Sequence, residues 1–135
     1  MDVFQVANYK DYLFDTAKTI FGIDSPTGYY HAVIKKVEEI ATGLGYQFEQ
    51  IEKGCGIITI EGEDNSRTVM MAAHVDTLGL MVRSITPKGE LKFTKIGGPI
   101  LPTLDGEYCR IRTRDGKVYT GTILCESAAV HVHPD

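Results

Sequence analysis

Two stretches near the start of the chain carry apolar residues at helical spacing. In residues 9–21 the apolar positions fall on one side of a 3.6-residue repeat, as in an amphipathic helix. Asn8 precedes this stretch as a candidate N-cap, and Gly22 ends it. Residues 29–44 repeat the pattern with a charged opposite face, and Gly45 follows as a C-terminal stop. We therefore predict two helices. The apolar face of the second consists of Val33, Ile34, Val37, Ile40, Ala41 and Leu44.

After the second helix the pattern changes to short strands. Residues 46–51 alternate between apolar and polar, which predicts a half-exposed strand. Residues 57–60 form a second apolar run, and residues 61–66 form a polar turn. Residues 68–73 are all small or apolar, the composition of a strand covered on both faces. The order helix, helix, strand, strand, strand predicts the beginning of an α/β sheet with one antiparallel pair at its edge.

The later part of the chain alternates short apolar runs with tight turns. We predict strands over residues 80–85, 91–96, 107–113 and 118–124. Asp115-Gly116 is a hairpin signature between the last two. No helix is predicted after Leu44, so this part is expected to be all-β, as in a small barrel. The chain would then divide near Ser84, with an α/β part in residues 1–84 and a β part in residues 85–135.

Composition and charge exclude several classes of protein. The chain has 135 residues, 43% of them hydrophobic, and a net charge of −4 without a basic cluster, which argues against a nucleic-acid partner. No apolar run is long enough to span a membrane, and the first residues lack the features of a signal peptide. Three cysteines without a metal-binding spacing suit reduced, structural thiols. We therefore expect a cytoplasmic protein without a membrane partner.

The candidate chemistry lies at the end of the apolar run 68–73, in His74-Val75-Asp76. A histidine at the carboxyl end of a central strand lies where α/β sheets bind ligands. A histidine that binds a metal usually donates its other ring N–H to a carboxylate, and Asp76 is placed to accept it. Short patterns of this kind also arise by chance. The alternative is a histidine satisfied by a backbone carbonyl, with Asp76 opening a turn.

Other metal-like patterns are weaker. His131 and His133 alternate along a predicted strand and share a face, but two ligands without a third make a poor site, so a structural role is preferred. A single-metal hydrolase would require this pair to converge with His74 and Asp76, and we predict that it does not. His31 is interpreted as an exposed helix residue.

Taken in order, these segments resemble the amino-terminal part of the cellulase-M / glutamyl-aminopeptidase family of two-metal aminopeptidases. The resemblance covers essentially the whole chain. Its motifs are Ser25-Pro26-Thr27-Gly28-Tyr29, Ala73-His74-Val75-Asp76-Thr77-Leu78-Gly79-Leu80-Met81-Val82, Ile96-Gly97-Gly98, Arg112-Thr113-Arg114-Asp115-Gly116-Lys117 and Gly121-Thr122-Ile123-Leu124.

The resemblance implies a fold, a reaction and partners. The fold would be the start of a phosphorylase/hydrolase-like α/β domain, with two helices and sheet strands, followed by part of an inserted β-barrel used in assembly. The family removes amino-terminal residues from peptides with two divalent metals, zinc or cobalt, and many members form tetrahedral dodecamers. His74 matches a metal ligand and Asp76 matches the acid that orients it. Thr77 stands where many members have Glu.

The resemblance also implies that much of the site is missing. Family members are more than twice as long, and their bridging Asp, catalytic Glu and remaining ligands match no residue here. The sequence therefore predicts at most one partial metal site in a truncated chain that is inactive alone. An interaction or assembly module derived from such an enzyme is an alternative, because an incomplete barrel leaves open strand edges. Some members are labelled as cellulases, which makes an endoglucanase-M-type protein a further alternative, although the pair of carboxylates that a glycosidase needs is not evident.

Overall fold

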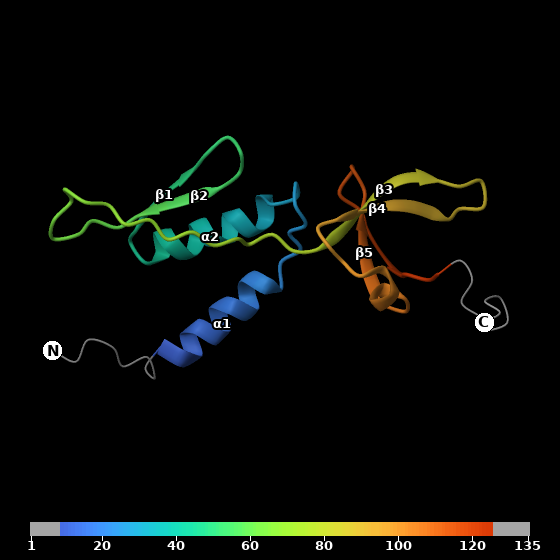
Figure 1. Ribbon diagram of the computed structural model, residues 1–135, viewed down its shortest axis with the longest axis horizontal. Coiled ribbons are helices and arrows are strands. Elements are labelled where there is room, and N and C mark those ends of the chain that lie inside the picture. The colour runs from blue at the N-terminus through green and yellow to red at the C-terminus, as the bar shows by residue number, and fades with distance from the viewer. Residues whose placement is uncertain (1–8, 126–135) are drawn as a thin grey trace. The chain divides into compact units, whose positions relative to one another are not determined.

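The computed structural model describes residues 9–125 of the chain. The chain divides into two units, one ending at Gly97 and one beginning at Gly98. In the first unit the elements are α1 (Lys10–Phe21), α2 (His31–Gly43), β1 (Gln47–Gln50), β2 (Gly56–Thr59), β3 (Gly79–Ile85) and β4 (Leu91–Ile96) (Figure 1). In the second they are η2 (Leu101–Leu104), β5 (Tyr108–Arg112) and β6 (Val118–Thr122). The described strands pair as three antiparallel hairpins: β1 with β2, β3 with β4, and β5 with β6.

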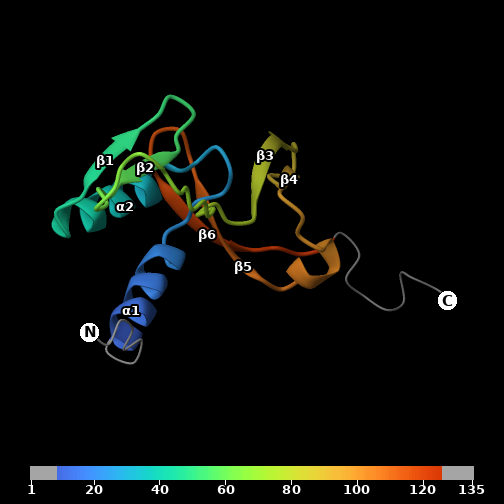
Figure 2. The same cartoon turned by 60° about the vertical axis from the view of Figure 1, so that its left-hand side comes forward.

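Helix α2 carries the buried side chains of the first unit. Val33, Ile34 and Ala41 are buried, and all three belong to the apolar face predicted from the sequence. This face packs against β1 and β2, which lie beside the helix (Figure 2). The helix ends as predicted, because Gly45 adopts φ +85° and its N–H donates to the Thr42 carbonyl at 3.0 Å. The second predicted helix is therefore confirmed, with slightly shorter bounds.

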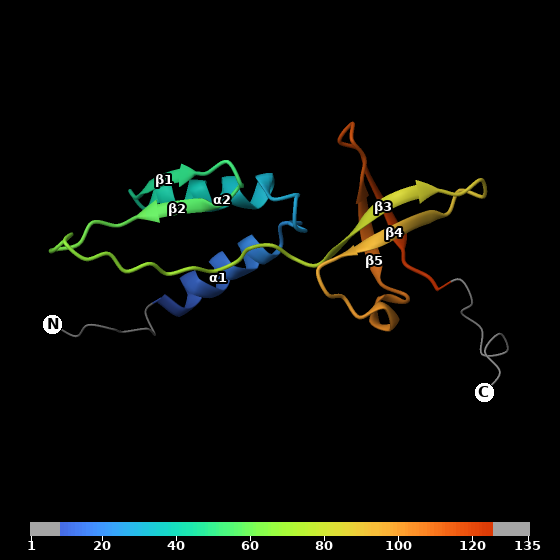
Figure 3. The ribbon, with the colours of Figure 1, turned by 45° about the horizontal axis from the view of Figure 1, so that its top comes forward.

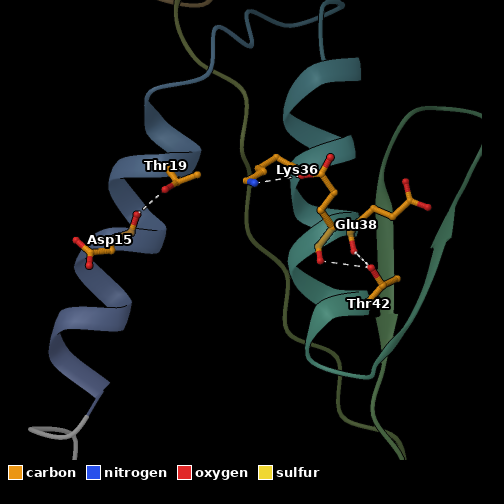
Figure 4. A network of polar contacts seen from close by, with 6 residues as sticks. Asp15, Thr19, Lys36, Glu38 and Thr42 are labelled. Carbon is orange, nitrogen blue, oxygen red and sulfur yellow. Dashed lines mark hydrogen bonds and ion pairs between the residues drawn. The ribbon is translucent and has the colours of Figure 1, made fainter.

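The polar faces of α1 and α2 are held by local contacts (Figure 4). The Thr19 hydroxyl donates to the Asp15 carbonyl at 2.8 Å, and the Thr42 hydroxyl donates to the Glu38 carbonyl at 2.7 Å. Lys36 and Glu39 form an exposed ion pair at 3.1 Å, a kind of contact that contributes about 0.2–0.5 kcal/mol on a helix surface. These contacts fit the solvated helix faces expected from the sequence.

Helix α1 has the predicted position but a different start. It begins after Tyr9, whose side chain makes no capping hydrogen bond, while the predicted cap Asn8 lies outside the described residues. None of its residues is buried, and Leu13 and Phe21 are exposed. The amphipathic pattern thus predicts the helix correctly, and within residues 9–125 its apolar face is covered only in part, with Ala17 and Ile20 half-buried.

The β1–β2 hairpin forms where alternation and glycine predict it. Phe48 pairs with Ile58, and the Phe48 ring lies over Gly56, where a Cβ atom would come within 2.5 Å of the ring. The turn closes through the Ile51 N–H, which donates to the Cys55 carbonyl at 3.0 Å. Gly54 at φ +87° lets the chain reverse.

The prediction of a covered central strand in residues 68–73 is wrong for the described part of the chain. Residues 68–73, between β2 and β3, run as an extended stretch without strand pairing (Figure 3). The exposed fractions of Val69, Met70 and Met71 are 88%, 85% and 94%. A central strand requires hydrogen-bonding neighbours on both sides and a layer over each face. Residues 9–125 supply neither, so the apolar run stays unpaired.

The remaining hairpins follow the predicted strands closely. Strands β3 and β4 pair from Gly79–Ile96 to Ile85–Leu91, with a bulge between Val82 and Ser84. In the second unit, β5 and β6 pair around Asp115-Gly116, where Gly116 has φ +83° and the Thr113 N–H donates to the Lys117 carbonyl at 2.9 Å. The predicted hairpin turn is confirmed.

One short element was not predicted. The expectation that no helix follows Leu44 is wrong for Leu101–Leu104, which forms the 3₁₀ turn η2. Pro102 favours the start of such a turn, and Thr103 stabilises it by donating from both its N–H (3.0 Å) and its hydroxyl (2.7 Å) to the Ile100 carbonyl. Four residues are too few to show helical periodicity in a sequence.

Candidate metal-binding segment

His74 and Asp76 lie in the extended stretch just before β3, and their side chains meet. The His74 Nδ1 atom is 3.1 Å from Asp76 Oδ1 and 3.2 Å from the Asp76 backbone carbonyl oxygen. The side chain of His74 is 86% exposed and that of Asp76 is 48% exposed. The structure therefore brings together the two residues that the sequence singled out, at the surface of the first unit.

A third residue completes this contact from a distant part of the chain. The Thr27 hydroxyl donates to Asp76 Oδ2 at 2.7 Å, so each carboxylate oxygen of Asp76 has its own partner. The Thr27 hydroxyl is also the main cause that lowers the pKa of Asp76, and the hydrogen bond from His74 lowers it further. An ionised carboxylate only accepts hydrogen bonds, so His74 Nδ1–H is the donor. Nε2 is the ring nitrogen left to bind a ligand.

The loop that carries Thr27 is tied to the His74–Asp76 segment by its neighbours. Ser25 is completely buried, and its hydroxyl donates to the Val75 carbonyl at 2.7 Å. The Thr77 N–H donates to the Ser25 carbonyl at 2.9 Å, and Pro26 and Thr77 form a parallel β-bridge. These contacts hold the loop beside the segment on both sides of Asp76.

Two glycines allow this close approach. Gly28 has φ +92° in a turn that the Tyr29 N–H closes by donating to the Pro26 carbonyl at 2.7 Å, as in a turn that requires glycine at its third position. Gly79 faces Pro26, and a Cβ atom at Gly79 would lie 2.5 Å from Pro26 Cβ. A larger residue at position 79 would therefore push the Pro26 loop away.

The sequence did not reveal the roles of Ser25 and Thr27. Both belong to the segment Ser25-Pro26-Thr27-Gly28-Tyr29, which contributed to the family resemblance but was interpreted only as a loop rich in turn-forming residues. The contacts of this loop span 49 and 50 residues along the chain. No periodicity or spacing reports such a contact. The one signal available in the sequence was that residues 25–29 and residues 73–82 both belong to the family resemblance.

Within residues 9–125, no group of three or more His, Cys, Asp or Glu side chains is placed to hold a metal ion. The His74–Asp76 pair fits the place of one metal ligand with its orienting carboxylate, since Nε2 is available and Nδ1 is fixed. A metal bound there would need further donors. The described residues thus offer one candidate ligand with its orienting carboxylate.

Among the described residues, no other candidate residue joins this pair. His31 packs its ring against Tyr30 at a centroid distance of 4.5 Å, at the start of α2. His131 and His133 lie outside the described residues. The acidic turn 61–66 is held by its own contacts, among them the Asn65 amide donating to Glu61 at 2.6 Å. Cys55, Cys109 and Cys125 are free thiols, as predicted. Among the described residues, no helix is long and apolar enough to cross a membrane.

Comparison with known protein families identifies the class to which this segment belongs. Residues 54–135 match the model of the M42 glutamyl aminopeptidase family, which covers the His74–Asp76 segment and everything after it. The chain belongs to this family. The resemblance found in the sequence motifs is therefore confirmed, and the family is one of metal-dependent peptidases.

Individual relatives agree with this assignment and set its extent. YhfE of Bacillus subtilis (strain 168) is 44% identical over 118 residues, which are 87% of this chain and 34% of YhfE. The solved structure of aminopeptidase APDkam598 from the archaeon Desulfurococcus kamchatkensis superposes with a TM-score of 0.80 at 28% identity. The match covers 90% of this chain and 33% of that one.

The fold extends to more distant structures. The TET1 peptidase of Pyrococcus horikoshii, described as able to assemble into a tetrahedron or a large octahedral shell, matches with a TM-score of 0.73 at 24% identity. This match covers 90% of this chain and 36% of that peptidase, and it concerns the fold. The chain thus spans about a third of the length of the proteins it matches. The two helices and small antiparallel sheets are the corresponding part of a larger aminopeptidase fold.

Proposed function

We propose that this chain forms the amino-terminal part of a metal-dependent aminopeptidase that removes amino-terminal residues from peptides. The observation that carries the proposal is the pairing of His74 with Asp76 at 3.1 Å in a chain of the M42 family. In this proposal His74 binds one metal ion through Nε2. Asp76 holds the imidazole so that Nδ1–H points away from the metal.

The contacts among the described residues indicate which part of the metal site this chain would provide. A complete metal centre would polarise the scissile carbonyl of the peptide and activate a water molecule, with zinc or cobalt as the candidate metals. This chain contributes a ligand and its orientation, because the described residues assemble no larger donor group. The chain alone is therefore expected to be inactive, and the remaining donors would come from polypeptide corresponding to the other two thirds of the relatives.

The domain organisation and assembly are part of the same proposal. Residues 1–84 would belong to the catalytic domain, and residues 85–135 would begin an inserted β-barrel that serves assembly into a homo-oligomer, a dodecamer in the complete enzyme. The hairpin content of residues 79–122 and the fold shared with the TET1 peptidase support this proposal. Three free thiols fit a reducing, cytoplasmic setting.

A second candidate function is that of an interaction module. The exposed apolar residues Val69, Met70 and Met71, in a stretch whose backbone pairs with no described strand, favour it. Monomeric proteins rarely keep such a stretch uncovered. In this alternative the chain would bind another polypeptide through residues 68–73 without contributing to catalysis.

The first proposal is tested by following the histidine ring signals of the chain by NMR during titration with Co²⁺, alongside hydrolysis of a panel of aminoacyl-anilides. We expect weak cobalt binding that perturbs the His74 signals and is lost in His74→Ala, without turnover. His31→Ala is the matched control, because His31 packs on Tyr30 away from Asp76, and it should bind as the wild-type chain does. Cobalt binding that survives His74→Ala would contradict the proposed ligand. Turnover by the unaided chain would contradict the partial site.

A further inference from the structure

We propose that Thr27 is a positioning residue of the metal site, because its hydroxyl holds the Asp76 carboxylate in the orientation in which it accepts Nδ1–H of His74. The Thr27 hydroxyl bonds to the Asp76 carboxylate and not to His74, so it acts through Asp76. This inference rests on the proposed function only in calling His74 a metal ligand. The contact itself, and its effect on the imidazole, can be measured without metal.

The carboxylate of Asp76 needs such a restraint. Its side chain is about half exposed, at 48%, and Asp76 belongs to none of the strands that form the hairpins. A carboxylate in this setting turns freely about its terminal torsion, where the energy wells are broad. The Thr27 hydroxyl at 2.7 Å on Oδ2 and the imidazole at 3.1 Å on Oδ1 together fix the carboxylate plane. If the Thr27 hydroxyl is removed, the His74 imidazole is left with a carboxylate that can rotate.

Thr27 is itself well anchored. Two residues earlier, the buried Ser25 bonds to the Val75 carbonyl and accepts the Thr77 N–H. One residue earlier, Pro26 bridges to Thr77. The Thr27 hydroxyl therefore meets Asp76 from a loop whose backbone is already joined to the same segment. A hydroxyl with a fixed position can restrain the orientation of the Asp76 carboxylate, whereas a mobile hydroxyl would move together with it.

The two roles that Thr27 can have differ in a measurable way. If Thr27 only helps the loop to fold, its removal should act on the loop and leave the imidazole tautomer unchanged. If it positions Asp76, its removal should weaken the hydrogen bond that fixes the proton on Nδ1. The tautomer of a neutral imidazole is set by the partner of each ring nitrogen. The proportion of Nδ1–H to Nε2–H at His74 therefore reports the positioning role.

The test is a long-range ¹⁵N–¹H correlation spectrum of the ¹⁵N-labelled chain at one fixed pH, about two units above the ordinary histidine pKa of about 6.5. In the wild-type chain we expect His74 to show an excess of Nδ1–H over a free neutral histidine. Thr27→Val, which keeps the shape and removes the hydroxyl, should lower the Nδ1–H to Nε2–H ratio about two- to tenfold, the effect of one hydrogen bond of ordinary net strength. Thr27→Ser, which keeps the hydroxyl, should restore the ratio.

Thr19→Val is the matched control, since the Thr19 hydroxyl bonds only within α1, to the Asp15 carbonyl. It should leave the His74 ratio unchanged. The Thr77 amide, which bonds to Ser25, shows in each variant whether the loop is still docked. An unchanged ratio in Thr27→Val with the loop docked would overturn the proposal. So would a ratio in Thr27→Ser that matches the valine variant, because a hydroxyl at position 27 would then not restore the ratio. Should Thr27→Val undock the loop, a His74 ratio that stays at the wild-type value would overturn the proposal, whereas a lowered ratio that Thr27→Ser restores would support it.

The outcome is separable from that of the proposed function. A ratio that responds to Thr27, with no cobalt effect at His74, would retain the positioning contact and overturn the metal ligand. A cobalt effect at His74 with a tautomer ratio that Thr27→Val leaves unchanged would support the metal ligand and overturn the positioning contact.

Discussion

At the scale of single residues, the candidate site depends on small distances that leave no room for change. Gly79 faces Pro26 at the point where the loop of Thr27 meets the segment of Asp76. Gly79 does not adopt a left-handed backbone conformation, so glycine is needed there because it lacks a side chain. The loop can approach only because position 79 carries no Cβ atom.

This contact predicts the effect of Gly79→Ala. The added Cβ would lie 2.5 Å from Pro26 Cβ, so the loop or β3 must shift. We expect a loss of about 1–3 kcal/mol in the free energy of unfolding, as for other overpacked sites. Thermal and urea unfolding followed by circular dichroism would measure it. Gly98→Ala is the control, because a Cβ there meets nothing within 4 Å. Equal stability of the two variants would contradict the tight contact.

Residues differ in how far the sequence reveals them. His74 and Asp76 are two positions apart, so their side chains can meet whatever the rest of the chain does, and the sequence suffices to pair them. Thr27 lies 49 residues from Asp76 and meets it only through the folded loop. Its partner depends on tertiary structure, which the local pattern does not contain.

At the scale of elements, the β5–β6 hairpin combines turn chemistry with charge. Gly116 provides the positive φ, while Asp115 receives the Thr113 hydroxyl and forms an ion pair with Lys117 at 3.1 Å. The Thr113 hydroxyl is the main cause that lowers the pKa of Asp115, and Lys117 lowers it further. The carboxylate thus favours the folded turn in its ionised form.

The sign of the pH dependence follows. Because the folded-state pKa of Asp115 lies below its ordinary value of 3.8, its contribution is fully present above that value. The contribution is lost as the pH falls through the lowered pKa. We expect an NMR titration of the Asp115 carboxyl to show a midpoint below 3.8, and Thr113→Val to move it upward. Thr103→Val, which affects only the η2 turn, should not. If Thr113→Val leaves the midpoint unchanged, another group must lower the pKa of Asp115.

Elements also differ in what the pattern can predict. The face of α2 and the three hairpins follow from periodicity and turn residues, which act within a few positions of the chain. The apolar run 68–73 has the composition of a buried strand, yet Met71 is 94% exposed. Composition reports what a segment can form when neighbours are present. It does not report whether those neighbours lie within the described residues.

At the scale of the whole molecule, the described chain leaves much apolar surface uncovered. Only Val33, Ile34 and Ala41 form its buried apolar core, while side chains from α1, β2 and residues 68–73 are exposed. Such a surface favours association with another polypeptide or with a second copy. The chain spans about a third of the length of YhfE.

We therefore expect the isolated chain to self-associate and Met71→Lys to oppose this. Fully burying a methionine is worth about 1.5–3 kcal/mol, so the association constant should fall at least about tenfold. The stability of the monomer should change little, because Met71 is 94% exposed. Analytical ultracentrifugation over a range of concentrations measures both species. Gln50→Lys, on the exposed strand β1, is the charge-matched control. A monomeric wild-type chain at all concentrations would contradict the expectation.

The bridge between Pro26 and Thr77 has a consequence for how this chain can vary in length. The two halves of the candidate site are joined by α2 and the β1–β2 hairpin, which pack on each other, and then by the exposed turn 61–66. The entropy of closing a loop grows only with the logarithm of its length, about 0.6 kcal/mol for each doubling. Insertions in the turn 61–66 therefore change the closure of the site by little, while an insertion between Ser25 and Thr27 would separate one of the two hydroxyls from its partner, Val75 or Asp76.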